Sequence, residues 1–452
     1  MNFLETASRY VQGASNWLWG PPMLILVLGT GIVLIIRLRA IQLTAFVSAW
    51  RATLSRSERD DDGDVSPMAA LMTAVGGIVG NGNIAGVATA IVMGGPGALF
   101  WMWMSGVFGM ATMFAESLLG VKYRNRGKDG LFVGGPMYYL RDGLRWPAVG
   151  AFFAFGLAAK TMLATTTIQS NSVASILRDQ LGWSPWLSCS LLAVVTGVVI
   201  IGGVKWIGLA SEVLTPFMGF LYLLASGCVL VYFAAEIPRA LGLVLEHAFT
   251  PFAGAGGVAG VAVKDAFRFG VARGVYSNEA GTGSVPIAHA SAKTNDPVRQ
   301  GKIAMLGVFL DTLVVATATG LVLVVTDSRS SGLDSTALVA HAFEAALGPI
   351  GGPLVMVASL LFGLTTLISW SFYGEQCATY LFGARLRLPY RLLYCVAILG
   401  GALTGAQAIW AWGDLLNAIM TIPNLIAVLF LSGEVKKALF NRPMSDTAEG
   451  AA

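Results

Sequence analysis

Long apolar stretches recur along almost the whole 452-residue chain, and short polar segments separate them. A helix rises 1.5 Å per residue, so roughly 20 apolar residues are needed to cross the hydrocarbon core of a bilayer. We therefore predict an all-α polytopic membrane protein with about eleven transmembrane helices. The predicted spans are residues 17–36, 68–93, 98–120, 150–177, 186–204, 213–235, 262–290, 303–325, 350–382, 390–410 and 412–432. Several exceed the minimum length, which indicates tilted, kinked or partly unwound helices.

Lysines and arginines lie mainly in every second polar segment. One set of segments carries most of them, at residues 37–59, 122–145, 205, 293–302, 385–391 and 436–442, whereas the other set carries Arg9, Arg178, Arg239 and Arg329. Basic residues collect on the cytoplasmic side of membrane proteins. We therefore expect a multi-pass protein of the plasma (inner) membrane with its N-terminus outside and its C-terminus in the cytoplasm. The first apolar stretch lacks a small-residue cleavage site, so we expect a retained span and not a signal peptide.

Composition agrees with a lipid environment and excludes several function classes. Hydrophobic residues make up 55% of the chain, charged residues make up 12%, and the mean hydropathy is +0.69. A soluble domain carries about 25% charged residues. Basic residues do not alternate with aromatic ones in a stripe, which argues against nucleic acid as a partner. The isolated cysteines and histidines predict no transition-metal site, and no hydrolase motif such as GxSxG or HExxH indicates an enzyme. No obligate protein partner is evident.

Two predicted spans contain dense clusters of helix-interrupting residues, at 76–86 and 270–283. The clusters lie in the second and seventh spans, so each begins a set of five helices, and an odd number of helices gives the two sets opposite orientations. Inverted repeats with a broken first helix are how many secondary transporters build a site at mid-membrane. We therefore divide the chain into an N-terminal helix and linker (1–66), two five-helix repeats (67–240 and 241–435) and a cytoplasmic tail (436–452).

A helix break exposes backbone groups that can bind a zwitterion or an ion. Unpaired N–H groups attract a carboxylate and unpaired carbonyls coordinate a cation, and such backbone survives in a membrane only where it lines a polar cavity. The predicted substrate residues at the first break are Gly77, Gly80, Asn81, Gly82 and Asn83, and a matching break is expected near Gly270 and Gly274. The alternative is that these glycines only allow close helix packing.

Five blocks of the sequence resemble the alanine/glycine:cation symporter family, also called sodium:alanine symporters. They read GGPGALFWMWMSGVFG at 94–109, GNGNIAGVA at 80–88, GGPMYY at 134–139, GVYSNEAGTG at 274–283 and SWSFYGE at 369–375. The resemblance runs from about residue 17 to 435. It implies a leucine-transporter-like 5+5 inverted repeat with one extra N-terminal helix, and import of alanine or glycine with sodium.

The resemblance also implies individual site residues. Gln169, an amide in the middle of a span, would contact the substrate, although an interhelical hydrogen bond would also explain it. The turn Gly363-Leu364-Thr365-Thr366 resembles a sodium-binding turn of this wider fold. One ion would then be surrounded by the carbonyls of Gly76, Val79 and Phe362 and by the hydroxyls of Thr365 and Thr366. Such hydroxyls often bond to their own helix backbone instead.

Trp370 lies one helical turn beyond Thr366, so its ring can share the cavity face and limit the substrate side chain. Phe372 is a weaker candidate for the same wall, and core packing is the alternative for both. Charged residues inside the predicted spans either serve function or pair structurally. A gate between Arg273 and Glu279 is one hypothesis, and none of the charges is assigned a coupling role.

These observations predict a secondary active symporter that imports a small neutral amino acid with sodium by alternating access. A carrier of the same fold for another solute, or one coupled to protons, is the closest alternative. A channel is disfavoured, because channels are usually symmetric oligomers around a pore, whereas the repeat here is internal.

Overall fold

The structure, a computed structural model, is almost entirely helical. It describes residue 11 and residues 13–15, 17–55, 61–250, 263–403 and 406–441, with side chains from residue 412 onward in the last range. Arg9, residue 262 and the part of the predicted tail from residue 442 onward lie outside the described residues.

The first half of the chain forms helices that mostly coincide with the predicted spans. They are α2 (Pro21–Arg37), α3 (Ile41–Thr44), α4 (Phe46–Leu54), α5 (Pro67–Ile78), the π-helical η1 (Gly82–Gly86), α6 (Val87–Gly94), α7 (Gly97–Lys122), α8 (Pro136–Tyr138), the π-helical η2 (Tyr139–Gly143), α9 (Pro147–Lys160), the π-helical η3 (Thr161–Thr165), α10 (Thr166–Leu181), α11 (Pro185–Ile201), α12 (Val204–Tyr232), the 3₁₀ turn η4 (Ala234–Glu236) and α13 (Ile237–His247). Two short antiparallel strands, β1 (Asn125–Arg126) and β2 (Phe132–Val133), form a hairpin after α7.

The second half contains another interrupted helix followed by long ones. Its elements are α14 (Val263–Asn278), α15 (Val285–Ala290), α16 (Pro297–Val308), the π-helical η5 (Phe309–Ala316), α17 (Thr317–Val325), the 3₁₀ turn η6 (Ser328–Ser331), α18 (Ser335–Leu347), the 3₁₀ turn η7 (Gly348–Ile350), α19 (Gly351–Phe382), the 3₁₀ turn η8 (Ala384–Leu386), α20 (Arg387–Ile398), the 3₁₀ turn η9 (Leu399–Ala402) and α21 (Ala406–Phe440).

Several helices begin with a capping residue followed by proline. The side chains of Ser66, Ser184 and Asp296 accept hydrogen bonds from backbone N–H groups in the first turns of α5, α11 and α16, and each is followed by proline. Proline at the first helical position loses nothing, because that N–H has no partner inside the helix. These sequences therefore set where the helices start.

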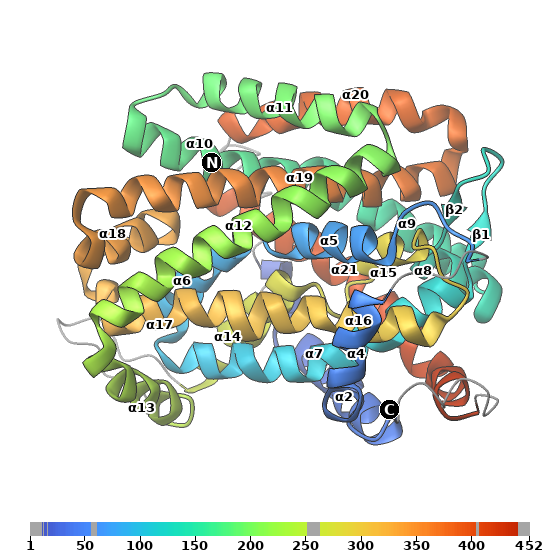
Figure 1. The fold of residues 1–452 in the computed structure, drawn as a ribbon, viewed down its shortest axis with the longest axis horizontal. Coiled ribbons are helices and arrows are strands. Elements are labelled where there is room, and N and C mark those ends of the chain that lie inside the picture. The colour runs from blue at the N-terminus through green and yellow to red at the C-terminus, as the bar shows by residue number, and fades with distance from the viewer. Residues whose placement is uncertain are drawn as a thin grey trace.

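The short helices next to the interruptions lie inside the bundle (Figure 1). Helix α5 packs against α12, α15, α16 and α19, and α14 packs against α6 and α7. Almost every side chain of α5 is buried. In contrast, Val194, Val198, Phe217 and Phe220 on α11 and α12 are exposed. Exposed large apolar side chains on a helix bundle are what contact with lipid requires.

Among the described residues, six helical stretches are long and apolar enough to cross a membrane, and α5 with residues Gly82–Gly94 forms a seventh that is bent by 48°. The count of eleven spans therefore remains a prediction. One predicted boundary is wrong, because α21 runs without interruption from Ala406 to Phe440, through the gap predicted at residue 411. Nothing in the stretch AQAIWAW stops a helix, and Gly413 is accommodated inside it.

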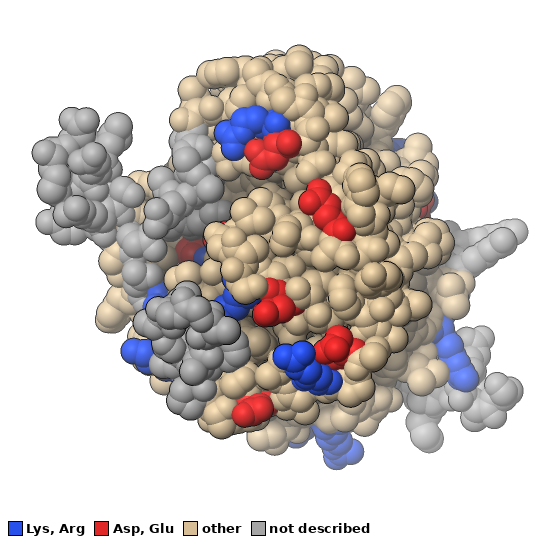
Figure 2. Space-filling view, turned by 90° about the vertical axis from the view of Figure 1, so that its left-hand side faces the viewer, with Lys and Arg blue, Asp and Glu red and all other residues tan. Residues whose placement is uncertain are grey.

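The end of the molecule that carries α13 and α18 shows few charges (Figure 2). Acidic and basic side chains are scattered there among uncharged ones and form no basic patch on this face. The described part of this face therefore has no basic patch of the kind that binds a polyanion such as nucleic acid.

Candidate functional site

The second predicted span is broken between α5 and η1, as predicted from its glycines and asparagines. Val79 leaves the helical conformation, and the chain bends before the helix resumes at Gly82. Backbone groups released at the break find side-chain partners. The Gly77 carbonyl accepts a 3.0 Å hydrogen bond from the Trp370 indole, and the Gly76 carbonyl accepts a 3.2 Å bond from the Thr366 hydroxyl. The break is therefore fastened to α19.

The second break lies at residues 279–284, between α14 and α15. Glu279, Gly281 and Gly283 have positive φ angles there, of 56°, 86° and 81°. Glycine adopts this conformation readily, whereas a residue with a side chain is strained in it. The Gly281 N–H donates to Glu116 on α7 over 3.3 Å, and its carbonyl accepts a 2.8 Å bond from Asn424 on α21. The second break is therefore fastened to α7 and α21.

The prediction that this span breaks near Gly270 and Gly274 is wrong. Both residues lie inside the continuous helix α14. A Cβ at Gly270 would collide with the backbone of Ala98, and one at Gly274 with the side chain of Ser105, both on α7. These two glycines allow α14 and α7 to approach closely, which is the packing role that small residues have between membrane helices.

Between the two breaks lies a cavity of about 20 Å³. Its lining comes from α5, the first break and η1, from α9 to α10, from α14 and the second break, and from α19: Gly77, Ile78, Gly80, Gly82, Lys160, Thr165, Gln169, Tyr276, Glu279, Thr366 and Trp370. A water molecule needs about 10–15 Å³. The described conformation is therefore closed tightly around the site, with room for about one water.

Of the predicted substrate residues, Gly77, Gly80, Gly82, Gln169 and Trp370 line this cavity. Gln169 also joins α10 to the first break, because its Oε1 accepts from the backbone N–H of Asn81 at 3.2 Å and from its side chain at 3.0 Å. The interhelical hydrogen bond weighed for Gln169 is therefore present, and its contact with substrate stays a prediction.

The other predicted substrate side chains do not line the cavity. The Asn81 amide bonds to Gln169 and Ser359, and the Asn83 amide donates to Asp311 over 2.7 Å. Phe372 is buried two residues beyond Trp370, about 200° around the helix, and packs against Tyr373. The two asparagine side chains therefore stabilise the break through contacts outside the cavity.

Four of the predicted sodium ligands lie close together beside the same break: Gly76 on α5, and Phe362, Thr365 and Thr366 on α19. Thr366 reaches the Gly76 carbonyl, and the Thr365 hydroxyl donates to the Leu361 and Phe362 carbonyls at 3.0 and 3.2 Å. Val79 is buried at the bend. The buried hydroxyl of Ser369, next to Gly76, has no hydrogen-bond partner within the described structure. This group of neutral oxygens suits a hard monovalent cation, which prefers oxygen ligands.

Transition-metal chemistry finds no support in the described ranges. There, no three histidine, cysteine, aspartate or glutamate side chains come together as potential metal ligands.

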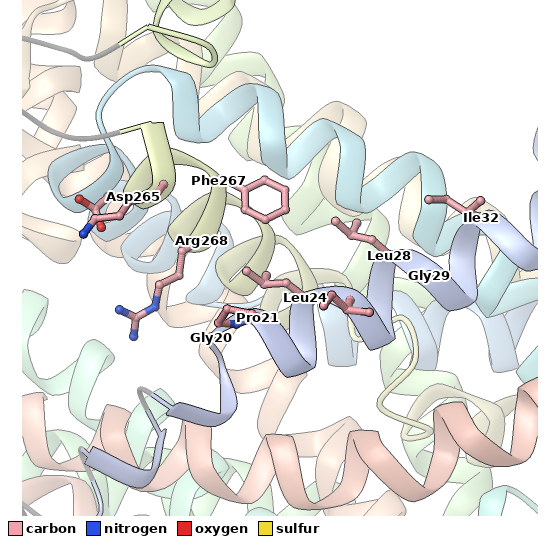
Figure 3. Close-up of a pocket in the computed structure, with 11 residues that line it drawn as sticks. Gly20, Pro21, Leu24, Leu28, Gly29, Ile32, Asp265, Phe267 and Arg268 are labelled. Atoms are coloured by element: carbon pink, nitrogen blue, oxygen red, sulfur yellow. The ribbon is translucent and has the colours of Figure 1, made fainter.

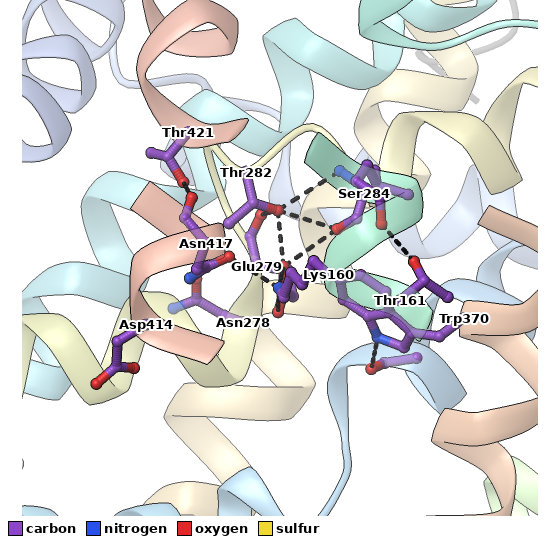
Figure 4. Close-up of polar contacts among 12 residues, drawn as sticks. Lys160, Thr161, Asn278, Glu279, Thr282, Ser284, Trp370, Asp414, Asn417 and Thr421 are labelled. Atoms are coloured by element: carbon purple, nitrogen blue, oxygen red, sulfur yellow. Dashed lines mark hydrogen bonds and ion pairs between the residues drawn. The ribbon is translucent and has the colours of Figure 1, made fainter. Parts of the chain in front are cut away.

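A buried ion pair that the sequence did not predict lies at the cavity wall. The Lys160 ammonium is 3.1 and 3.3 Å from the two carboxylate oxygens of Glu279, and it donates to the Asn417 amide oxygen over 2.8 Å (Figure 4). Arg273 instead pairs with Asp414 on α21, at 3.0 and 3.1 Å. Each of these two residues therefore has another partner in the described conformation, and a gate between Arg273 and Glu279 stays a hypothesis. The sequence signal for the Lys160–Glu279 pair was the position of both charges inside predicted spans, and this position does not identify which charges pair.

Two further carboxyl groups are buried near the breaks. Asp311 on η5 accepts hydrogen bonds from Asn83, Ser277 and Thr312, and Glu116 accepts from Asn424 and the Gly281 N–H. Among the described residues, neither forms an ion pair with a lysine or arginine. Buried carboxyls with neutral partners inside a membrane domain are functional candidates.

A larger groove of about 600 Å³ lies away from the breaks, between α2 and α14 (Figure 3). Leu24, Leu28, Ile32 and Phe267 give it an apolar lining, and Arg268 lies near one end. Its position on the flank of the bundle and its apolar lining match lipid more closely than a zwitterionic solute.

Comparison with known proteins agrees with the geometry. Residues 4–446 match the sodium:alanine symporter family. The chain is 42% identical over 430 residues to an uncharacterized transporter of Haemophilus influenzae, covering 94% of each chain. It is 41% identical over 459 residues to the sodium/alanine symporter AgcS of Methanococcus maripaludis, covering 98% of this chain and 99% of the relative.

A solved structure of MhsT in complex with L-phenylalanine has a similar fold, with a TM-score of 0.64 at 13% sequence identity over 86% of this chain and 95% of that one. The predicted family is thus confirmed, and so is the expectation of a transporter and not an enzyme. The chain is a multi-pass membrane protein, an amino acid:cation symporter in class, and it belongs to the sodium:alanine symporter family.

Proposed function

We propose that the protein imports alanine or glycine together with sodium. The observation that supports this most directly is the meeting of two broken helices at one small cavity. A break offers N–H groups to a carboxylate and carbonyls to a cation, so one cavity can take both a zwitterion and an ion. The family name also points to sodium and alanine.

The cavity walls support the proposal of a small substrate. Trp370 covers one side, and a Cβ added at Gly77 would lie 2.8 Å from the Tyr373 hydroxyl. The walls thus have no space for a bulky side chain next to the first break. Gly80, Gly82 and Gln169 complete the substrate-binding group. Asn81 and Asn83 stabilise the break through hydrogen bonds made outside the cavity.

Sodium would bind between α5 and α19. Its ligands would be the carbonyls of Gly76, Val79 and Phe362 and the hydroxyls of Thr365 and Thr366, and the partnerless Ser369 hydroxyl is close enough to join them. An ion there would link the first break to α19 and favour the conformation in which the substrate site is formed. Coupling follows if ion and substrate both bind one conformation more tightly than the other.

The remaining features of the proposal concern topology. Eleven spans, in two inverted sets of five preceded by one helix, would place the N-terminus outside and the C-terminus in the cytoplasm. The four parts would be residues 1–66, 67–240, 241–435 and 436–452. Alternating access would expose the cavity first to one side of the membrane and then to the other.

Uptake of radiolabelled alanine into proteoliposomes tests the proposal. An inward sodium gradient should raise the initial rate over that in choline, and unlabelled glycine should compete. Equal rates in sodium and choline would exclude sodium coupling.

Proton coupling is the second candidate, because Asp311 and Glu116 are buried carboxyls whose partners are neutral. A matched experiment with an inward proton gradient and no sodium separates the two. Uptake that follows the proton gradient in the absence of sodium would show that protons drive transport.

A further inference from the structure

An ammonium group already occupies the wall of the substrate cavity. Lys160 is 1% exposed, and its Nζ lies at the point where α9, the second break and α21 meet. Its ammonium contacts the Glu279 carboxylate and the Asn417 amide oxygen, and it lies 4.1 Å from the centre of the Trp370 ring. The ring of Tyr276 is 5.6 Å away.

This set of partners recognises the ammonium and not the lysine as a whole. A carboxylate and an amide oxygen accept the N–H donors of any primary ammonium, and an aromatic face attracts its charge. We call Glu279, Asn417 and Trp370 the ammonium cage. Glu279 and Trp370 both line the cavity, so a ligand in the cavity has access to two of the three groups.

The carboxylate of the cage is held in position by more than Lys160. The hydroxyls of Thr282 and Ser284 donate to Glu279 Oε2 at 2.8 and 3.2 Å (Figure 4). The backbone of Glu279 is in the left-handed region, at φ 56°. A non-glycine residue stays in this strained conformation only when its surroundings enforce it. The cage is therefore built around the second break and not assembled by the lysine alone.

We propose that the ammonium cage receives the α-ammonium of the amino acid, and that Lys160 occupies it while no substrate is bound. This inference rests on the proposed function, since it names the group that recognises the substrate. With the lysine in place the cavity has room for about one water. An amino acid can enter only if Lys160 withdraws from the cage.

Charge balance explains why an amino acid and not a simple amine would displace the lysine. A buried ammonium that loses its carboxylate partner is strongly destabilised. A zwitterion brings an ammonium for Glu279 and a carboxylate for Lys160, so every charge keeps a partner of opposite sign. A plain amine would leave Lys160 unpaired.

The first experiment tests the cage with methylammonium and does not depend on transport. Lys160→Ala removes the internal ammonium, and the thermal unfolding midpoint is measured in detergent with methylammonium or with tetramethylammonium chloride. Methylammonium should raise the midpoint of Lys160→Ala, whereas tetramethylammonium has no N–H donor and should not. If Lys160→Ala can be purified in a folded state only when methylammonium is present, that outcome would support the ammonium cage equally.

The matched control is Lys160→Ala/Glu279→Gln, which lacks the carboxylate and should not respond to methylammonium. An equal response of single and double variants, or no response of the single variant, would overturn the cage.

The second experiment tests the transfer to the substrate. Lys160→Gln/Glu279→Gln removes both charges and keeps side chains of similar shape. Loss of a charge-assisted hydrogen bond should raise the alanine concentration for half-maximal uptake roughly 10- to 100-fold. An unchanged value would make the pair purely structural and refute the inference. If the unaltered protein takes up no alanine, the proposed function fails, while the methylammonium result still decides whether the cage exists.

Discussion

Replacement of Trp370 tests whether its ring limits the size of the substrate. The side chain is 2% exposed, its indole donates to the Gly77 carbonyl over 3.0 Å, and its ring lies against Lys160. Trp370→Phe removes the hydrogen bond and keeps most of the ring, so it should cost about 1 kcal/mol. Trp370→Ala also removes the ring and should cost about 3–5 kcal/mol of stability.

The effect on selectivity should be larger in Trp370→Ala than in Trp370→Phe. A tight pocket distinguishes substrates that differ by one methylene by about 1–3 kcal/mol, or roughly 10- to 200-fold. We expect Trp370→Ala to lower the preference for alanine over leucine by at least about tenfold. The assay is the initial rate of uptake of each labelled amino acid into proteoliposomes at matched protein content.

The control is Phe372→Ala, which removes a buried ring from the same helix but away from the cavity. It should reduce stability and leave the preference unchanged. An unchanged preference in a folded Trp370→Ala protein would refute the reasoning and make Trp370 an ordinary packing residue.

Three further predictions concern other parts of the structure. Thr365→Ala and Thr366→Ala should raise the sodium concentration for half-maximal alanine uptake, whereas Thr319→Ala, on α17, should not; an unchanged sodium dependence would remove both threonines from the ion site. Gly274→Val should destabilise the packing of α14 on α7 by about 1–3 kcal/mol, and substrate preference should be unaltered in the folded fraction, as measured by thermal unfolding and uptake. Outside the membrane, burial raises the pKa of the Asp64 carboxyl above its usual value, so its contribution to stability is present at low pH and is lost as pH rises through the folded pKa. Asp64→Asn should flatten that part of the pH dependence of thermal unfolding, and an unaltered profile would contradict it.

Local sequence was sufficient to predict the first break. Gly80-Asn81-Gly82-Asn83 combines residues that favour non-helical backbone with amides that can satisfy it, and the helix stops there. The same reasoning misplaced the second break. Gly270 and Gly274 recur on one face of α14 and allow close packing, whereas Gly281 and Gly283 adopt positive φ. Glycine density alone does not distinguish these two uses.

The partners of the buried charges could not be predicted from the sequence. Lys160 and Glu279 are 119 positions apart, and Arg273 and Asp414 are 141 apart. Their pairing depends on how α9, α14 and α21 pack, which no local pattern specifies. All four residues lie inside predicted spans, but their sequence positions suggested only the pair Arg273 and Glu279, which lie in the same segment of sequence.

The separate anchoring of the two breaks constrains how the pocket can open. One wall is tied to α19 through Trp370 and Thr366, and the opposite wall is tied to α7 and α21 through Glu116 and Asn424. A sliding of α19 relative to α21 would therefore separate the two walls of the pocket. Solvent access to the pocket would then depend on the relative position of these two long helices, and cross-linking one to the other should stop turnover while leaving the ligand groups intact.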